Sequence, residues 1–326
     1  MTNETGSRRD SLISAVAMTL SAAVLLSGVG LRTRASAYDV NSDTATVQLE
    51  SAAGIGRSAD IPQLLTEEYS RDTNMRSRQT GIALYIDGTR YSGKTFLYRD
   101  TTYVGIREFT GAIAGANITW NEKTSTATAK TAAVTVTATK GKEYISANGR
   151  YLWAKTGIII REGTMYVPVR PLAAAYGATV EWDAGTRSVK VKKGSGAILS
   201  GSKYYNADEV YWLSKIINAE SRGEPMLGKI AVGNVVLNRV RSKDYPNTIY
   251  GVIFDRKYGV QFSPVSDGSI HLEPDADSVI AAKLCLEGYT VSKSILFFIN
   301  PKIATSMWVT TSRPFEVSIG RHDFYA

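Results

Sequence analysis

A regular hydrophobic pattern that begins after Asn206 predicts a helix ending just beyond Glu220. Asn206 is a good N-cap, and Leu213, Ile216 and Ile217 then recur at helical spacing. Glu220 follows Ile216 by four positions, so it falls on the same apolar stripe. Burial and the negative end of the helix dipole both favour the protonated carboxyl there, which suits a general acid near neutral pH. A helix-end Glu that turns to solvent fits the same spacing.

The rest of the C-terminal part reads as mainly helical. Residues 226–240 are apolar all round and predict the central buried helix. Asn234 and Asn238 on this helix are expected to bond to backbone, and orienting the Glu220 loop is the alternative. Cys285 falls in an apolar helical pattern and is expected to be a small core residue. The other predicted elements are helices at 248–254 and 274–286, a β-hairpin at 259–270, and strands at 294–299 and 315–325.

Residues 81–194 show strand alternation and an internal duplication. Tyr103-Val104-Gly105-Ile106-Arg107 matches Tyr166-Val167-Pro168-Val169-Arg170 at an offset of 63, and Trp120 matches Trp182 at an offset of 62. Each unit predicts strand, turn, strand, a short helix and two more strands, with the repeated Arg and Trp in core or capping positions. The hairpin turns are expected at Asp87-Gly88 and Asn148-Gly149.

The N-terminal region is typical of an exported protein. In residues 1–37, Arg8 and Arg9 precede an uncharged run, and Ala35-Ser36-Ala37 forms an A-x-A cleavage site. We expect a cleaved signal peptide, although a run of about 20 residues could also remain as an anchor. Residues 38–80 are polar and acidic and predict a flexible linker. A repeat domain at 81–194 and a catalytic domain at 203–326 complete the expected α+β organisation.

The positive charge of the chain lies in the repeat segment. The whole sequence carries a net charge of +8. Residues 81–194 hold 16 Lys and Arg against 8 Asp and Glu, whereas residues 200–326 hold 14 against 13. Such a surplus attracts polyanions, which for an exported protein means anionic wall polymer or the outer face of a membrane, and not nucleic acid. We therefore expect the protein at the cell wall, the spore cortex or the inner spore membrane surface. A solubilising surface is the alternative.

Several blocks of residues 206–326 resemble the SleB/CwlJ cell-wall hydrolase family, which includes spore-cortex-lytic enzymes. They are INAESRGEP, GKIAVGNVVLNRV, YPNTIYGVIF, QFSPVSDG, FFINPKIATSMW and IGRHDF. The resemblance implies a lysozyme-like, mainly helical domain with a small β flap, Glu220 as catalytic acid, and peptidoglycan as substrate. The block MYVPVRPLAAAYGATVEWD is similar to the copper amine oxidase N-terminal domain. No copper or other cofactor is expected, because His271 and His322 both lie outside that segment.

Candidate substrate contacts follow from residue types that bind sugars, since aromatic rings stack on sugar faces and amides bond to hydroxyls. His322, near the chain end, is expected to be structural. The candidates lie close to Glu220, in the QFS block and in the later blocks: Glu224, Gln261, Phe262, Ser263, Asn300 and Trp308.

The reaction class depends on whether Glu220 has a carboxylate partner. Glycoside hydrolysis usually needs two carboxylates, and Glu224, Asp255 and Asp267 are the candidates for the second. One acid without a partner predicts a lytic transglycosylase, in which the 6-hydroxyl of the sugar attacks its own anomeric carbon. A zinc-dependent muramoyl-alanine amidase and a non-catalytic wall-binding germination protein are the alternatives. Cortex or vegetative wall, and any germination partner, stay open.

Overall fold

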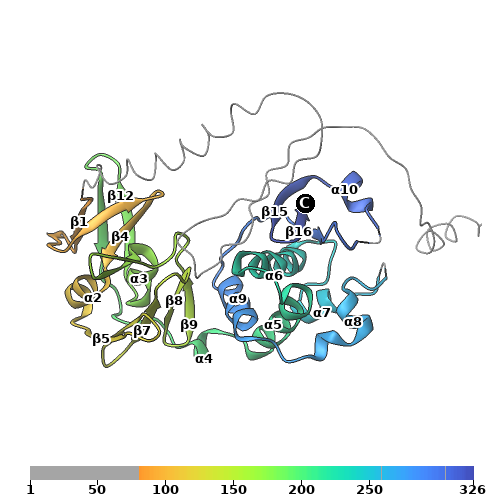
Figure 1. Cartoon of the computed structure of the whole chain (residues 1–326), viewed down its shortest axis with the longest axis horizontal. Coiled ribbons are helices and arrows are strands. Elements are labelled where there is room, and N and C mark those ends of the chain that lie inside the picture. Colours follow the sequence, from red (N-terminus) through yellow and green to blue (C-terminus); the bar gives the residue numbers. More distant parts are fainter. Residues whose placement is uncertain (1–80, 258, 305) are drawn as a thin grey trace, which may run out of the picture. The chain divides into compact units, whose positions relative to one another are not determined.

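The structure, a computed structural model, describes residues 81–257, 259–304 and 306–326 (Figure 1). The signal peptide predicted at 1–37 and the linker predicted at 38–80 lie outside the described residues. Buried hydrophobic residues gather into one large cluster between Leu84 and Val191 and another between Leu213 and Phe324. The first is strand-rich and the second mainly helical, which confirms the α+β class. Among the described residues no helix has the length and apolar character needed to cross a membrane.

Residues 81–194 fold into three antiparallel or mixed sheets with two helices, α2 (Ile106–Ala114) and α3 (Val169–Ala175). The sheets have the strand orders β12-β13-β1-β2, β10-β11-β4-β3 and β5-β6-β7-β8-β9. The strands are β1 (Ala83–Ile86), β2 (Thr89–Arg90), β3 (Thr95–Tyr98), β4 (Thr101–Gly105), β5 (Asn117–Asn121), β6 (Thr126–Lys130), β7 (Thr135–Thr139), β8 (Tyr144–Ala147), β9 (Arg150–Trp153), β10 (Ile159–Arg161), β11 (Thr164–Pro168), β12 (Thr179–Asp183) and β13 (Ser188–Lys192).

The internal duplication of the sequence is visible in the strand pairing. β4 and β11 pair antiparallel, with Gly105 opposite Tyr166 and Tyr103 opposite Pro168. Because the offset between the units is 63, these two pairs are equivalent, so the units meet about a local two-fold axis. β13 of the second unit also pairs in parallel with β1 of the first. Each unit therefore completes its sheets with strands of the other.

Both predicted hairpin turns are present. Asp87 and Asn148 have φ values of 47° and 48°, and Gly88 and Gly149 have values of 80° and 81°. Two successive residues in the left-handed region match the twist of the strands on either side. The turns connect β1 to β2 and β8 to β9 at equivalent places in the two units.

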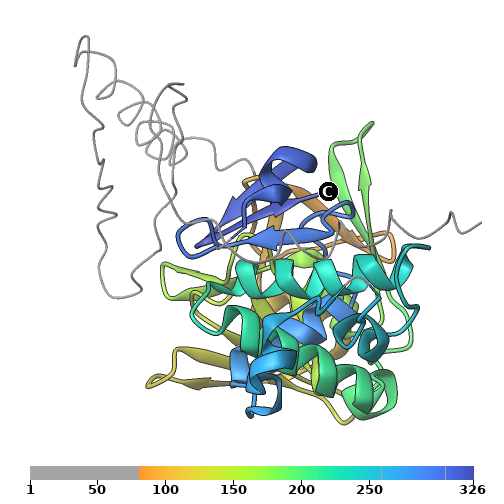
Figure 2. The same cartoon turned by 90° about the vertical axis from the view of Figure 1, so that its right-hand side faces the viewer.

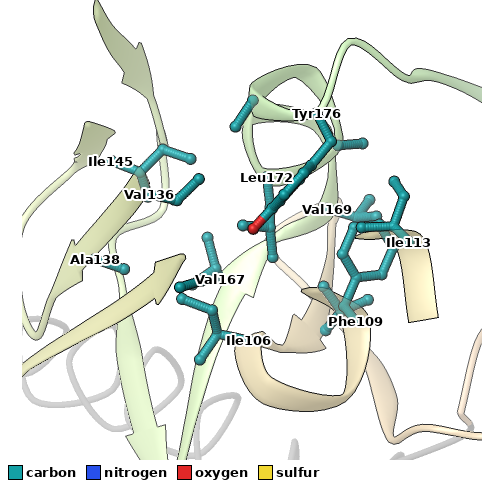
Figure 3. Close-up of a cluster of buried hydrophobic side chains, with 14 of the residues drawn as sticks. Ile106, Phe109, Ile113, Val136, Ala138, Ile145, Val167, Val169, Leu172 and Tyr176 are labelled. Atoms are coloured by element: carbon teal, nitrogen blue, oxygen red, sulfur yellow. The ribbon is translucent and has the colours of Figure 1, made fainter. Parts of the chain in front are cut away.

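The core of the repeat lies between its two helices and the strands. Figure 3 shows Ile106, Phe109 and Ile113 of α2 facing the same interior as side chains of α3 and of β7, β8 and β11. The expectation that the repeated tryptophans belong to this core is wrong. Trp120 and Trp182 are 42% and 46% exposed, because they lie on β5 and β12, each an edge strand of its sheet.

The C-terminal part packs several helices and a small sheet of order β14-β16-β15 around α6. In both views α6 lies between that sheet and α5, and it contacts α5, α7, α9 and β14 (Figures 1 and 2). The elements are α4 (Gly201–Tyr204), α5 (Ala207–Ser221), α6 (Met226–Arg241), α7 (Ile249–Ile253), α8 (Ser263–Asp267), a 3-10 turn (Ser269–His271), α9 (Ala276–Leu286), β14 (Phe297–Ile299), α10 (Trp308–Ser312), β15 (Phe315–Ile319) and β16 (His322–Tyr325).

The predicted central helix is confirmed in its bounds and its polar contacts. Asn234 Nδ2 donates to the carbonyl of Tyr289, and Asn238 Nδ2 donates to the carbonyl of Ile295. The two amides thus hold the backbone that follows α9. Gly233 allows the close approach of the helices, because a methyl group there would lie 2.7 Å from Sγ of Cys285. Cys285 is buried, as its pattern predicts.

The β-hairpin predicted at residues 259–270 is wrong. The segment forms α8 and a 3-10 turn instead. Pro264 stands in the first turn of α8, where its missing N–H costs no hydrogen bond, and Gly268 ends the helix with a φ of 80°. The small β element of this part is the C-terminal sheet.

Candidate active site

Glu220 lies in the last turn of α5, and the sequence features that predict this helix act as expected. The side chain of Asn206 accepts hydrogen bonds from the backbone N–H groups of Asp208 and Glu209, at 2.9 and 3.3 Å. Leu213 and Ile216 are fully buried on the stripe that leads to Glu220. The carboxyl is therefore carried to the edge of the helical core and is itself half-buried.

Three contacts fix the end of α5 and with it the position of Glu220. Lys229 is buried on α6, and its ammonium donates to the carbonyl of Arg222 at 3.0 Å, beyond the last turn of α5. The same ammonium pairs with Asp275 at 3.3 Å. The Asn218 side chain accepts from the backbone N–H of Asp275 at 3.1 Å. A cation at the C-terminal end of a helix satisfies its free carbonyls and opposes its dipole.

Burial raises the pKa of Glu220 to about 7. The carboxylate of Asp267 adds to this increase, and the guanidinium of Arg239 opposes it. Within the described residues the Glu220 carboxyl has no hydrogen bond or ion pair of its own. It is thus an uncommitted carboxyl that holds its proton up to neutral pH, as a general acid requires.

Glu224 is committed to a structural contact. Its carboxylate accepts from the backbone N–H and from Nε of Arg321, both at 2.8 Å, and its side chain is only 4% exposed. Arg321 also donates to the carbonyl of Gly223 at 2.9 Å. A side chain at Gly320 would collide with the Glu224 carboxylate. Glu224 therefore ties the loop after α5 to the turn between β15 and β16.

The other two carboxylate candidates are in different environments from Glu220. Asp267 is exposed, and its hydrogen bonds with Ser269 lower its pKa. Asp255 follows α7 and accepts from the backbone N–H of Lys257 at 2.9 Å. Both are therefore turn residues with local hydrogen bonds.

A buried arginine beside this site was not predicted. Arg239 lies in the last turn of α6, is 5% exposed and donates through Nε to the carbonyl of Leu296 at 2.8 Å. Its guanidinium lies 5.1 Å from the ring centroids of Tyr245 and Phe262 and 5.5 Å from that of Phe297. A charged residue within a helix that is apolar all round was the available clue, since Arg is almost never buried without a reason.

The QFS block takes part mainly through Phe262. Its ring is 2% exposed and faces Arg239, so it forms part of the wall beneath the surface. Gln261 is half-buried, and its Nε2 donates to the carbonyl of Gly259 at 3.3 Å. Ser263 is exposed at the first position of α8.

Trp308 stands at the start of α10 with 52% of its surface exposed. Its ring meets that of Phe297 edge-on at 5.6 Å, and Phe297 in turn neighbours Arg239. A chain of contacts thus leads from the exposed indole to the buried arginine. Asn300 makes a local turn instead, accepting from the backbone N–H of Lys302 at 3.1 Å.

His322 is buried on β16 and packs edge-on against Phe298 at 5.4 Å, and burial lowers its pKa. In the described ranges no three side chains of His, Cys, Asp or Glu come close enough together to hold a metal ion.

Two family models match the chain. Residues 85–191 match the Copper amine oxidase N-terminal domain, and residues 223–325 match Cell Wall Hydrolase, directly after the helix that carries Glu220. The C-terminal part is a cell wall hydrolase domain. Both resemblances seen in the sequence are thereby confirmed.

Curated relatives and a solved structure match the cell wall hydrolase domain. The spore cortex-lytic enzyme of Bacillus cereus is 39% identical over 120 residues, which cover 37% of this chain and 45% of that protein. The one of Oceanobacillus iheyensis is 36% identical over 140 residues, 43% of this chain and 46% of that protein. The chain thus spans just under half the length of these relatives. The catalytic domain of the germination-specific lytic transglycosylase SleB from Bacillus anthracis is 37% identical, with 40% of this chain and all of that one covered and a TM-score of 0.35.

Proposed function

We propose that this protein cleaves the glycan strands of peptidoglycan as a lytic transglycosylase, with Glu220 as its acid and then its base. The observation that carries the proposal is the contrast among the carboxylates. Glu220 is uncommitted and has a pKa of about 7, whereas Glu224 is paired with Arg321 and Asp267 is exposed with a lowered pKa. A single group that titrates near neutrality can both give and take a proton.

The proposed reaction needs no nucleophile from the enzyme. Glu220 gives its proton to the glycosidic oxygen, the bond between that oxygen and C1 of the muramoyl residue breaks, and positive charge develops at C1. The 6-hydroxyl oxygen of the same sugar then bonds to C1, and its proton goes to the ionised Glu220. The products are a free 4-hydroxyl on one strand and a 1,6-anhydromuramoyl end on the other, with no water consumed.

We propose spore cortex as the substrate and germination as the occasion. Support comes from the relatives, which are spore cortex-lytic enzymes and a germination-specific lytic transglycosylase. Among the candidate contacts, Trp308 has the exposed ring that stacking on a sugar requires. Substrate binding by Glu224, Gln261, Phe262, Ser263 and Asn300 stays a prediction.

The test is Glu220→Gln, assayed on purified spore cortex. Gln keeps the shape and the hydrogen-bonding groups but cannot deliver a proton, so turbidity loss should slow by about 10²-fold or more. Glu209→Gln is the matched control, because it removes the same carboxyl from the exposed first turn of α5. It should retain wild-type activity.

Product analysis separates the reaction classes. The expected muramoyl ends are lighter by one water than hydrolytic ends, are not reduced by borohydride and carry no label after digestion in ¹⁸O-water. Labelled, reducible muramic ends would indicate a hydrolase that uses a second carboxylate. Free stem peptides would indicate an amidase, and full turbidity loss by Glu220→Gln would refute the role of Glu220.

We further propose that residues 81–194 hold the enzyme on anionic wall material outside the cell membrane. The support is the surplus of eight positive charges in that segment, together with exposed Trp120 and Trp182 at equivalent sites of the two units. Binding of the isolated segment to sacculi should weaken steeply above roughly 0.15 M salt, where the screening length is about 8 Å. Sedimentation with sacculi at 0.05 and 0.5 M NaCl measures this, and binding that is absent or indifferent to salt contradicts it.

A further inference from the structure

The duplication of the repeat places an exposed tryptophan at equivalent positions of the two units. Trp120 lies on β5 and Trp182 on β12, and each of these strands is the edge of its sheet. The two residues are 42% and 46% exposed, whereas tryptophan is on average highly buried in folded proteins. A large apolar ring left in water at the same place in both units indicates a contact with something outside the fold.

The backbone after each tryptophan forms the same turn. The side chain of Asn121 accepts from the backbone N–H of Thr124 at 3.3 Å, and the side chain of Asp183 accepts from that of Thr186 at 3.1 Å. Such turns, in which a side chain replaces a backbone acceptor, hold the end of the strand in one conformation. Both indoles are therefore presented from a fixed backbone, which lowers the entropy lost when a ligand binds.

An arginine accompanies each tryptophan. Arg107 and Arg170 are equivalent at the offset of 63, stand second in α2 and α3, and are exposed. Nη1 of Arg170 donates to the carbonyl of Val180 at 2.7 Å. Val180 comes two positions before Trp182, so the two side chains project from the same face of β12, about 7 Å apart along the strand. The guanidinium is thus held on the edge strand that presents the indole.

The fold does not account for the two arginines. A cation is disfavoured in the first turn of a helix, where the dipole is positive. Within the described residues Arg107 makes no hydrogen bond or ion pair, so the bond from Arg170 to Val180 is not what the two units share. They share an exposed guanidinium on a helix that packs against the sheet of the tryptophan, α3 on β12 and α2 on β6, the neighbour of β5.

The nearby carboxylates distinguish the two places. Nε1 of Trp120 donates to the carboxylate of Glu122, whereas Ala184 stands at the equivalent position of the second unit. At that second place the carboxylate of Asp183 is paired with Lys190 at 2.6 Å. The second place therefore suits an anionic ligand better than the first.

We propose that the two tryptophan–arginine pairs are equivalent binding sites for wall glycan: Trp120 with Arg107, and Trp182 with Arg170. The proposal rests on the wall binding proposed above for residues 81–194. In each site the indole stacks on the apolar face of a sugar ring, and the guanidinium pairs with an anionic oxygen group next to that sugar. Carboxylates of stem peptides and phosphates of wall polymers share that chemistry. A polymer that occupies both sites is held more tightly than by either alone.

Binding of the full chain to sacculi tests the two sites. The parent protein carries Glu220→Gln, so that the wall stays intact, and is sedimented with sacculi at roughly 0.15 M salt. The variants are Trp120→Leu, Trp182→Leu, both together, and Arg107→Gln. Leucine keeps an apolar side chain but offers no flat face for stacking. Lys130→Gln is the matched control, because it removes an exposed positive charge from β6 of the same segment.

The expected result is a graded loss of binding. Each single Leu variant should bind about threefold to tenfold more weakly than the parent, and the double variant about 10²-fold more weakly, because two linked sites reinforce each other. Arg107→Gln should bind about threefold to tenfold more weakly, since it loses charge-assisted hydrogen bonds. Lys130→Gln should stay within about twofold of the parent. Acid extraction of phosphate polymers from the sacculi then identifies the anionic group: binding that survives assigns stem-peptide carboxylates, and binding that is lost assigns wall phosphates.

A second readout reports each site directly. The indole N–H resonances of Trp120 and Trp182, identified by their loss in the Leu variants, should move when the disaccharide tripeptide of the wall or the extracted phosphate polymer is added. Resonances that both probes leave unmoved overturn the proposal. Movement with the free tripeptide but not with the two glycans also overturns it, because the ligand is then a peptide.

The outcomes separate this proposal from the wall binding on which it rests. Leu variants that bind like the parent, with Arg107→Gln no weaker than Lys130→Gln, show that net charge alone holds the wall; this overturns the two sites and leaves wall binding in place. A parent protein that does not bind sacculi refutes the wall binding, and the indole resonances still decide on the sites. Where leucine prevents folding, Arg107→Gln decides, because Arg107 makes no hydrogen bond or ion pair in the described part of the chain.

Discussion

The raised pKa of Glu220 predicts that Glu220→Gln is more stable than the wild type at neutral pH. Burial of this carboxyl favours its neutral form, so the folded protein holds the proton up to a pH of about 7. The unfolded chain releases it near the ordinary value of 4.5. Between these two values the folded state binds more protons than the unfolded state, and stability falls as pH rises. Above pH 7 both states are ionised and the cost stays constant.

The magnitude follows from the width of that window. The pKa of Glu220 shifts from 4.5 to about 7 on folding. Because each pKa unit corresponds to about 1.4 kcal/mol, ionisation of Glu220 lowers the free energy of unfolding by at most about 3 kcal/mol. Gln imitates the protonated carboxyl and never ionises. The variant should therefore equal the wild type below pH 4.5 and exceed it by up to about 3 kcal/mol at pH 8.

Calorimetry at pH 4 and pH 8 measures the effect, with Glu209→Gln as control. The transition of the cell wall hydrolase domain is the one that Glu220→Gln displaces, which separates it from unfolding of the repeat domain. The stabilisation should be large at pH 8 and absent at pH 4. A variant that is equally stable at pH 8, or that is stabilised alike at both pH values, would show that Glu220 ionises normally in the folded protein.

Two further predictions concern neighbours of Glu220. Asp267→Asn removes a negative charge that raises the pKa of Glu220, so the alkaline limb of the pH–rate profile should move to lower pH. The movement should be smaller at 0.5 M than at 0.05 M NaCl, because salt screens the charge of Asp267. Movement of the limb to higher pH would contradict this prediction. Gly320→Ala should lower the melting temperature and the activity together, because its side chain displaces Glu224 from Arg321; a melting temperature equal to that of the wild type would refute the collision.

The parts of the fold that were predicted correctly are those determined by neighbours in sequence. The Asn206 cap, the buried stripe of α5 and the two left-handed turns at Asp87 and Asn148 depend on local chemistry. The hairpin expected at 259–270 failed because its alternation of apolar and polar residues also fits two short helical turns, and Pro264 and Gly268 decide between them. The exposure of Trp182 depends on which strand lies at an edge, which pairing between the two units determines.

The sequence predicts the acid of the candidate site, Glu220, but not the residues that surround and hold it. Glu220 could be found because periodicity places it on a buried stripe. Its supports come from residues distant in sequence, such as Lys229 on the carbonyl of Arg222 and Asp275 on Asn218. No spacing in one sequence predicts that Arg321 returns to hold Glu224, a contact 97 residues apart. Site residues that are held by a segment distant in sequence can be identified only from the three-dimensional structure.

The cost of burying Glu220 and the proposed chemistry have the same physical origin. With its ordinary pKa of 4.5, about one carboxyl in 300 would hold a proton at pH 7, whereas a pKa of about 7 makes that fraction about half. The same burial makes the ionised form costly once the proton has left. An enzyme with a second carboxylate would place another negative charge nearby and increase that cost. The positive charge of Arg239 opposes the increase in the pKa of Glu220. One acid, no nucleophilic carboxylate and a substrate hydroxyl that completes the reaction are consistent with this balance.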